Sequence, residues 1–333
     1  MPRLVAKILC VAVGSASLLS GCGHRSASPG HAAYAATRKA AKKLSVIGFW
    51  AHSQSGPVSL VAANSKDVSV LSPLWYSLDG SGNLRPKVDQ SLLSIARQKH
   101  ISITPLVSDA TGTQAFLTSS VTRKRAVQAI DQMVRSMHFQ GVNLDFEPPH
   151  TRVQSELTAF VTELRDTLPK SESITMDIVP HSGGAYDYQH LTPNLNGYIV
   201  MSYDQHSQGT IEGPVAALNW VESVEARLVK KVPASKLYLG VALYGYSWPS
   251  GSTNAATVPS SQIPAAVKAK ATWNARAQEM TAMVGGDTYW WENSRGLAQK
   301  IALAKRDHLA GIAAWQLGYA DASIYRQLRS AMD

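Results

Sequence analysis

The 333-residue chain contains only two cysteines, and 17% of its residues are charged. Two cysteines are too few to cross-link a small secreted scaffold or to supply a zinc cluster. The hydrophobic fraction of 45% is ordinary, which excludes a wholly disordered chain. The chain is therefore long and apolar enough to bury a sizeable core, as one large domain or two ordinary ones.

Signatures of several ligand classes are also missing. No zinc-finger or RNA-recognition motif accompanies the net charge of +9, and no LysM-like wall-binding repeat occurs. The histidines His181, His190 and His206 lack the paired spacing of metal ligands. We predict no nucleic-acid partner, no metal and no cofactor. Much of the excess of basic over acidic residues lies before residue 44, and an anionic lipid surface or wall polymer is the expected target of those charges.

The first 43 residues differ from the rest of the chain. Arg3 and Lys7 precede an apolar run, Ile8 to Leu19, which has the length of a secretory signal and is too short to cross a bilayer. Leu19-Ser20-Gly21-Cys22 resembles a bacterial lipobox. We predict a lipoprotein signal peptide over 1–21 and a lipidated Cys22. A plain cleaved signal is the alternative.

Lipidation of Cys22 would anchor the exported protein to the outer face of a bacterial cytoplasmic membrane, or to the cell envelope or spore. Residues 22–43 read as a basic, flexible tether. Removing residues 1–21 leaves 30 basic and 23 acidic residues, a net charge of +7.

From residue 44 onward, short apolar runs alternate with segments of helical periodicity. Apolar residues at spacings of three and four, such as those following Val127, Leu157 and Val221, predict helices that cover a sheet. Eight apolar runs predict strands: Ser45–Trp50, Val68–Trp75, Ile101–Val107, Val142–Glu147, Ile174–Val179, Tyr198–Tyr203, Leu237–Tyr244 and Ile312–Trp315.

Eight strands in about 290 residues favour an α/β fold of the (β/α)8 TIM-barrel type over 44–333, with an open doubly wound sheet as the alternative. Residues 246–289 are too long for an ordinary loop. We predict that they form an insertion between the seventh and eighth strands.

One predicted strand carries an unusual polar face. In Gly141–Glu147, alternation places Asn143, Asp145 and Glu147 on one side of the strand. Polar groups inside a barrel must hydrogen-bond one another or cost several kcal/mol. Glu147 would emerge at the C-terminal rim, where barrel enzymes hold their active sites. This alternation indicates a catalytic site, although a strand-end acid can also cap a following helix.

This strand resembles the Asp-Gly-x-Asp-x-Asp-x-Glu signature of glycoside hydrolase family 18, the chitinase-like TIM barrels. Other segments resemble further strands of that family in the same order. They are Val46-Ile47-Gly48-Phe49-Trp50, Met201-Ser202-Tyr203-Asp204, Leu239-Gly240-Val241-Ala242-Leu243-Tyr244-Gly245 and Gly311-Ile312-Ala313-Ala314-Trp315-Gln316-Leu317-Gly318.

The resemblance implies a retaining glycosidase acting beside N-acetylglucosamine in peptidoglycan or chitin-like glycans. Glu147 would be the general acid/base, and the substrate's acetamido carbonyl would be the nucleophile. Asp145 and Tyr203 would hold the acetamido group. Asp204 would contact the distorted sugar, and Trp315 would form the floor beneath it.

The resemblance further implies that Asn143, Met201, Trp50 and Tyr244 belong to the substrate site. Ordinary structural roles remain open for three of the candidates: Tyr203 as a rim tyrosine, Asp204 as a turn residue and Trp315 as core packing.

Three positions depart from the family pattern. Gln140 and Asn143 stand where aspartates are usual, and Tyr246 stands where chitinases often have arginine. Asn143 could hydrogen-bond Asp145 but could not share a proton with it, which predicts activity with an altered pH profile. The Asn143 variant and Trp75-Tyr76-Ser77-Leu78 look more like the spore-germination and cortex-lytic branch. A non-catalytic, lectin-like glycan-binding protein is the alternative. We expect a monomer.

Overall fold

The computed structural model describes residues 43–51, 56–147, 153–180 and 184–333. The predicted signal peptide, the predicted lipidation site at Cys22 and residues 22–42 of the predicted tether lie outside these ranges. None of the described helices is both long and apolar enough to cross a membrane.

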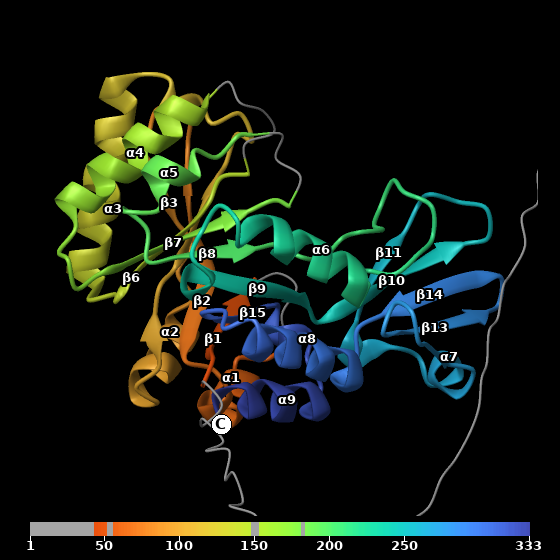
Figure 1. Ribbon diagram of the computed structural model, residues 1–333. Helices are drawn as coiled ribbons and strands as arrows, with labels where there is room; N and C mark the ends of the chain where they lie inside the picture. The colour runs from red at the N-terminus through yellow and green to blue at the C-terminus, as the bar shows by residue number, and fades with distance from the viewer. Residues whose placement is uncertain (1–42, 52–55, 148–152, 181–183) are drawn as a thin grey trace, which may run out of the picture. The chain divides into compact units, whose positions relative to one another are not determined.

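Eight of the described strands form a closed parallel barrel (Figure 1). Each pairs with its neighbours in the order β1-β15-β9-β8-β7-β6-β5-β2, and the pairing of β2 with β1 closes the ring. The fold is therefore the expected (β/α)8 barrel. Its strands are β1 (Ser45–Trp50), β2 (Val70–Leu78), β5 (Leu106–Asp109), β6 (Gly141–Asp145), β7 (Ser173–Ile178), β8 (Gly197–Val200), β9 (Leu237–Ala242) and β15 (Gly311–Trp315).

Several predicted strands end earlier than the apolar pattern suggests. β6 stops at Asp145 and β8 at Val200, so that Glu147 and Tyr203 lie just beyond the sheet. The run predicted over Ile101–Val107 is divided into β4 (Ser102–Ile103) and β5, with Pro105 between them. Proline has no N–H for a ladder hydrogen bond, which accounts for this break.

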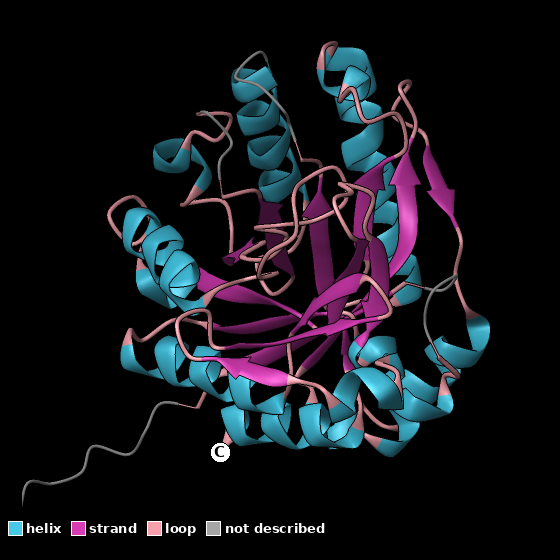
Figure 2. Cartoon of the chain, turned by 90° about the vertical axis from the view of Figure 1, so that its right-hand side faces the viewer, coloured by secondary structure: helices cyan, strands magenta, loops and turns pink. Residues whose placement is uncertain are grey.

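Helices surround the barrel (Figure 2). Asp89, Ser119, Asn293 and Asp321 accept hydrogen bonds from first-turn N–H groups and so fix where four of the helices begin. The helices are α1 (Ser59–Ala63), α2 (Gln90–Gln98), α3 (Ser120–Met137), α4 (Gln154–Thr167), α5 (Tyr188–Leu191), α6 (Leu218–Leu228), α7 (Ala265–Ala269), α8 (Ser294–Arg306) and α9 (Ala322–Met332).

Side chains alternate between the two faces of each strand, so the buried apolar residues form two separate cores. Val142, Leu144 and Phe146 join the large cluster between strands and helices, where the ring of Phe146 lies 5.5 Å from that of Phe160 on α4. A smaller cluster that includes Phe49 and Ile199 packs separately, with Trp315 against it. The predicted apolar face of β6 is thus buried against the helices, which leaves its polar face for the barrel interior.

A second, antiparallel sheet lies between β9 and β15 in sequence, at the right of Figure 1. Its order is β11-β10-β14-β13-β12, and it spans the residues predicted as an insertion. The strands are β10 (Tyr244–Pro249), β11 (Ala256–Pro259), β12 (Thr272–Asn274), β13 (Glu279–Val284) and β14 (Asp287–Trp291).

A buried ionic cluster joins this sheet to helix α8. Lys300 forms ion pairs with Glu292, which follows β14, and with Glu279 on β13, whose Oε1 lies 3.7 Å from the Lys300 Nζ. The Glu279 carboxylate also accepts the backbone N–H groups of Val215 and Ala216, at 2.9 and 2.6 Å. These residues precede α6, so the cluster also anchors the segment that follows β8.

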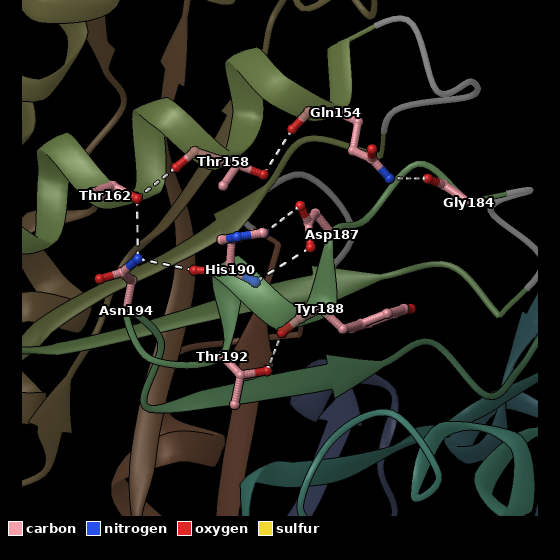
Figure 3. Close-up of polar contacts among 9 residues, drawn as sticks. All are labelled: Gln154, Thr158, Thr162, Gly184, Asp187, Tyr188, His190, Thr192 and Asn194. Carbon is pink, nitrogen blue, oxygen red and sulfur yellow. Dashed lines mark hydrogen bonds and ion pairs between the residues drawn. The ribbon is translucent and has the colours of Figure 1, made fainter.

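Polar contacts fix the segment between β7 and β8 against helix α4 (Figure 3). The amide of Asn194 donates to Thr162 on α4 at 3.0 Å. His190 pairs with Asp187, the N-cap of α5, at 2.7 Å. Gln154 donates to the carbonyl of Gly184 at 2.5 Å. These contacts hold residues 184–194 in place beside α4.

Candidate active site

A cavity of about 370 Å³ opens at the C-terminal ends of the barrel strands. It contains seven of the nine residues predicted for the site, contributed from β6, β10, β15 and the chain after β8. They are Asp145, Glu147, Met201, Tyr203, Asp204, Tyr244 and Trp315, and the cavity is also lined by Asp177, Val179 and Pro180.

Glu147 and Asp145 project from the end of β6 as hydrogen-bonded carboxyl groups. Glu147 has a φ of 30°, in the left-handed region that is strained for a residue with a side chain. Gln114 donates to the neighbouring carbonyl of Phe146 at 2.8 Å and holds this turn. Burial, followed by the charge of Glu147 and the hydrogen bond with it, raises the pKa of Asp145 to about 7.

Asn143 lies beneath the cavity and does not make its predicted bond to Asp145. Its amide donates to both oxygens of Asp177 at 3.0 Å, and its carbonyl accepts from Thr175 at 2.6 Å. Both partners belong to β7, because the cross-strand register aligns Asn143 with Thr175. Asp177 is not among the residues predicted for the site from the sequence. Thr175 and Asp177 nevertheless repeat on β7 the polar alternation seen on β6.

Asp204 is held by two tyrosines from the second sheet. The Tyr244 hydroxyl donates to the Asp204 Oδ1 at 2.6 Å, and the Tyr246 hydroxyl donates to the same oxygen at 2.8 Å. Burial raises the pKa of Asp204, and the two hydrogen bonds partly offset this rise. Asp204 has a φ of 58°, which turns the chain sharply after Tyr203.

The sequence does not predict the contact between Tyr246 and Asp204. It shows Tyr246 only as a departure at the position where chitinases often have arginine. Gln140, another of the three departures, precedes β6 at the end of the strand away from Glu147. Its side chain bonds the backbone of Ile103 and His138, away from the cavity.

The predicted tryptophans divide into two groups. Trp315 lines the cavity at the end of β15, half-buried, with its ring 5.3 Å from that of Phe49. Trp50 is only 1% exposed and belongs to the core, so the structure does not bring it to the cavity. Trp75 and Trp248 are likewise buried. Trp315 is therefore the one described tryptophan that lines this cavity.

The arrangement is suited to acid–base chemistry on a neutral, flat-faced substrate. Paired carboxyl groups can donate and accept protons, a tyrosine lines the same cavity, and an indole offers an apolar surface there. Within the described ranges, no group of three or more His, Cys, Asp or Glu side chains is arranged to hold a metal ion.

The barrel and its carboxyl-lined mouth define a TIM-barrel hydrolase of the acid–base type. Residues 46–320 match the model of the glycosyl hydrolases family 18, and the chain belongs to this family. The protein is thus a chitinase-like glycoside hydrolase.

Two curated relatives of the chain come from Bacillus subtilis. The uncharacterized glycosylase YvbX of Bacillus subtilis is 24% identical over 281 residues, which cover 76% of this chain and 82% of YvbX. A cortical fragment-lytic enzyme of B. subtilis is 25% identical, over 63% of this chain and 54% of that enzyme. The chain thus spans about half the length of the cortical fragment-lytic enzyme.

Two solved structures share this fold. The spore cortex-lytic enzyme SleL of Bacillus cereus aligns with a TM-score of 0.79 and 19% identity, covering 88% of this chain and 75% of SleL. A chitinase of Chromobacterium violaceum aligns with a TM-score of 0.78 and 20% identity, covering 86% and 98%.

Proposed function

We propose that this glycosidase cleaves β-1,4 bonds beside N-acetylglucosamine in peptidoglycan or chitin-like glycans, by retaining, substrate-assisted catalysis. The observation that carries the proposal is the hydrogen-bonded Asp145–Glu147 pair, which shares one cavity with Tyr203 and Trp315. Relatives named as chitinases and as cortex-lytic enzymes support this range of glycans.

The spacing of the two carboxyl groups favours a nucleophile from the substrate. A retaining enzyme that uses its own carboxylate as nucleophile separates its two carboxyl groups by about 5–5.5 Å across the bond to be cleaved. Asp145 and Glu147 lie within hydrogen-bonding reach of each other, which is closer than that separation. The 2-acetamido carbonyl of the substrate is then the group placed to attack the anomeric carbon.

In this scheme, Glu147 donates its proton to the glycosidic oxygen as the bond to the leaving sugar breaks. Asp145 accepts the acetamido N–H, which orients the carbonyl oxygen and balances the developing positive charge. Tyr203 donates to the acetamido group, and Trp315 supports the apolar face of the sugar. Glu147 then removes a proton from the water that opens the intermediate.

The test compares wild type with the Glu147→Gln variant on purified peptidoglycan and on chitooligosaccharides, with mass analysis of the reducing ends. We expect the loss of the acid to reduce kcat at least about 100-fold on the true substrate. Glu156→Gln on α4, outside the cavity, is the matched control and should keep wild-type rates. Equal hydrolysis by wild type and Glu147→Gln would refute the assigned acid.

We also propose that the protein is exported and lipid-anchored through Cys22, on the strength of its lipobox-like sequence alone. Mass spectrometry of the mature N-terminus, with and without globomycin, tests this proposal. An unmodified mature chain that lacks Cys22 would refute it.

A further inference from the structure

Strand β7 directs one carboxyl group into the barrel. Ile174, Met176 and Ile178 pack in the large apolar core, so Thr175 and Asp177 point to the opposite face. Asp177 is only 4% exposed and yet lines the active-site cavity. A buried acid in a strand interior is costly, so its presence calls for a role.

The strand register places Asp177 beside Asp145. β6 and β7 run parallel with Asn143 opposite Thr175 and Leu144 opposite Met176. The next step along both strands brings Asp145 and Asp177 level on the inner face, where neighbouring strands lie about 4.8 Å apart. The two acids are therefore neighbours on adjacent barrel strands.

Among the described residues, no positively charged group contributes to the electrostatic environment of Asp177. Asp145 and Glu147 approach it from β6, and Tyr203 approaches it from the chain after β8. The amide of Asn143 donates a hydrogen bond to each oxygen of the Asp177 carboxyl group. Burial, together with the charges of Asp145 and Glu147, holds the pKa of Asp177 well above its usual value.

The neighbouring oxygen of Asp145 points to the same arrangement. Asp145 Oδ1 is buried and makes no hydrogen bond within the described structure. Two ionised carboxylates on these neighbouring strand positions would repel each other, which favours a protonated Asp177.

We propose that Asp177 is a positioning residue that completes a three-carboxyl cluster with Asp145 and Glu147, supplying from β7 the acid that Asn143 lacks on β6. Asp145 and Asp177 gain and lose protons as a coupled pair in the field of the Glu147 charge. Asn143 serves as the hydrogen-bonding link that holds the Asp177 carboxyl in place. This inference rests on the proposed catalytic roles of Asp145 and Glu147.

The test is the pH profile of kcat/KM for Asp177→Asn. In wild type, the last proton of the cluster leaves a site beside two negative charges, which raise its pKa. In the variant, only one negative charge remains beside it. The alkaline limb should therefore move to lower pH by about one unit. The exchange variant Asn143→Asp/Asp177→Asn returns the third carboxyl group to β6 and should restore the limb. A purely structural Asn143–Asp177 contact predicts no movement in either variant.

Thr175→Val is the matched control, because it removes the other hydrogen bond to Asn143 without changing any carboxyl group. It should lower the melting temperature and leave the position of the alkaline limb unchanged. An unmoved limb in Asp177→Asn, or a limb that moves equally in Thr175→Val, would overturn the inference.

A second measurement does not depend on turnover. The ¹³C carboxyl resonances of the aspartates report the cluster's titration in the free enzyme, and its highest pKa should fall in Asp177→Asn and recover in the exchange variant. If wild type hydrolyses none of the glycans, the proposed function fails, and this titration alone decides the role of Asp177. An unchanged titration refutes the cluster.

Discussion

Lys300 offers a quantitative test of how the second sheet supports the active site. The side chain is about 2% exposed and lies between Glu279 and Glu292, whose side chains are fully buried. Lys300→Met keeps most of the volume and removes the charge. Removing one partner of a buried ion pair costs about 3–5 kcal/mol, because it leaves an uncompensated buried charge.

This loss should be visible as a lower melting temperature. A domain of this size shifts by about 2 °C per kcal/mol, so we expect a fall of about 6–10 °C. Lys270→Met removes an equivalent charge from an exposed position at the end of α7 and should change the melting temperature by less than about 1 °C.

The loss should also depend on pH. Burial raises the pKa of Glu292 to about 7 and raises that of Glu279, while Lys300 lowers both. Without Lys300 the two folded-state pKa values rise further above their unfolded values. The variant is then most stable below the unfolded carboxyl pKa and loses stability as pH rises through the folded values. The difference from wild type should be smaller at pH 5 than at pH 8.

Thermal unfolding of the three proteins at pH 5 and pH 8 makes the comparison. The reasoning fails if Lys300→Met melts within 2 °C of Lys270→Met at pH 8, or if its deficit grows at pH 5. Because Glu279 also holds the backbone of Val215 and Ala216 after the Tyr203–Asp204 turn, kcat should fall together with stability.

Two further changes test the cavity itself. Tyr246→Phe removes one of the two hydroxyl donors to Asp204, so the pKa of Asp204 should rise, and the acidic limb of kcat should move to higher pH with about a 10-fold lower rate. An unmoved limb in the pH profile would contradict this. Trp315→Ala removes the apolar floor and should lower kcat/KM about 10- to 100-fold, whereas Trp315→Phe should retain part of the activity in the same steady-state assay. Equal losses in both variants would argue against a platform role.

The barrel itself could be predicted from local pattern. β1 matches its predicted range, Ser45–Trp50, because apolar residues fill a strand covered on both faces. The rim could not be predicted as well, since apolar and aromatic residues continue past the last ladder hydrogen bond. The chain after Val200 is an example: Met201 and Tyr203 read as strand but form the cavity wall.

The sequence also could not show which large aromatic side chains are buried in the core. Trp50 and Trp315 both end a barrel strand, yet one is core and the other lines the cavity. Their sequence contexts are similar, so the difference depends on which neighbouring strands and loops cover each indole. Tyr246 shows the same limit, because its bond to Asp204 joins residues 42 positions apart.

Asp177 shows what a single strand can and cannot reveal. The alternation in Ser173–Ile178 marks Thr175 and Asp177 as inward-facing just as it marks Asn143 and Asp145. Only the register of β7 on β6 shows that the Asn143 amide meets the Asp177 carboxyl. An asparagine at a family's aspartate position therefore need not remove an acid from the site, because the adjacent strand can supply one that the asparagine amide holds by hydrogen bonds.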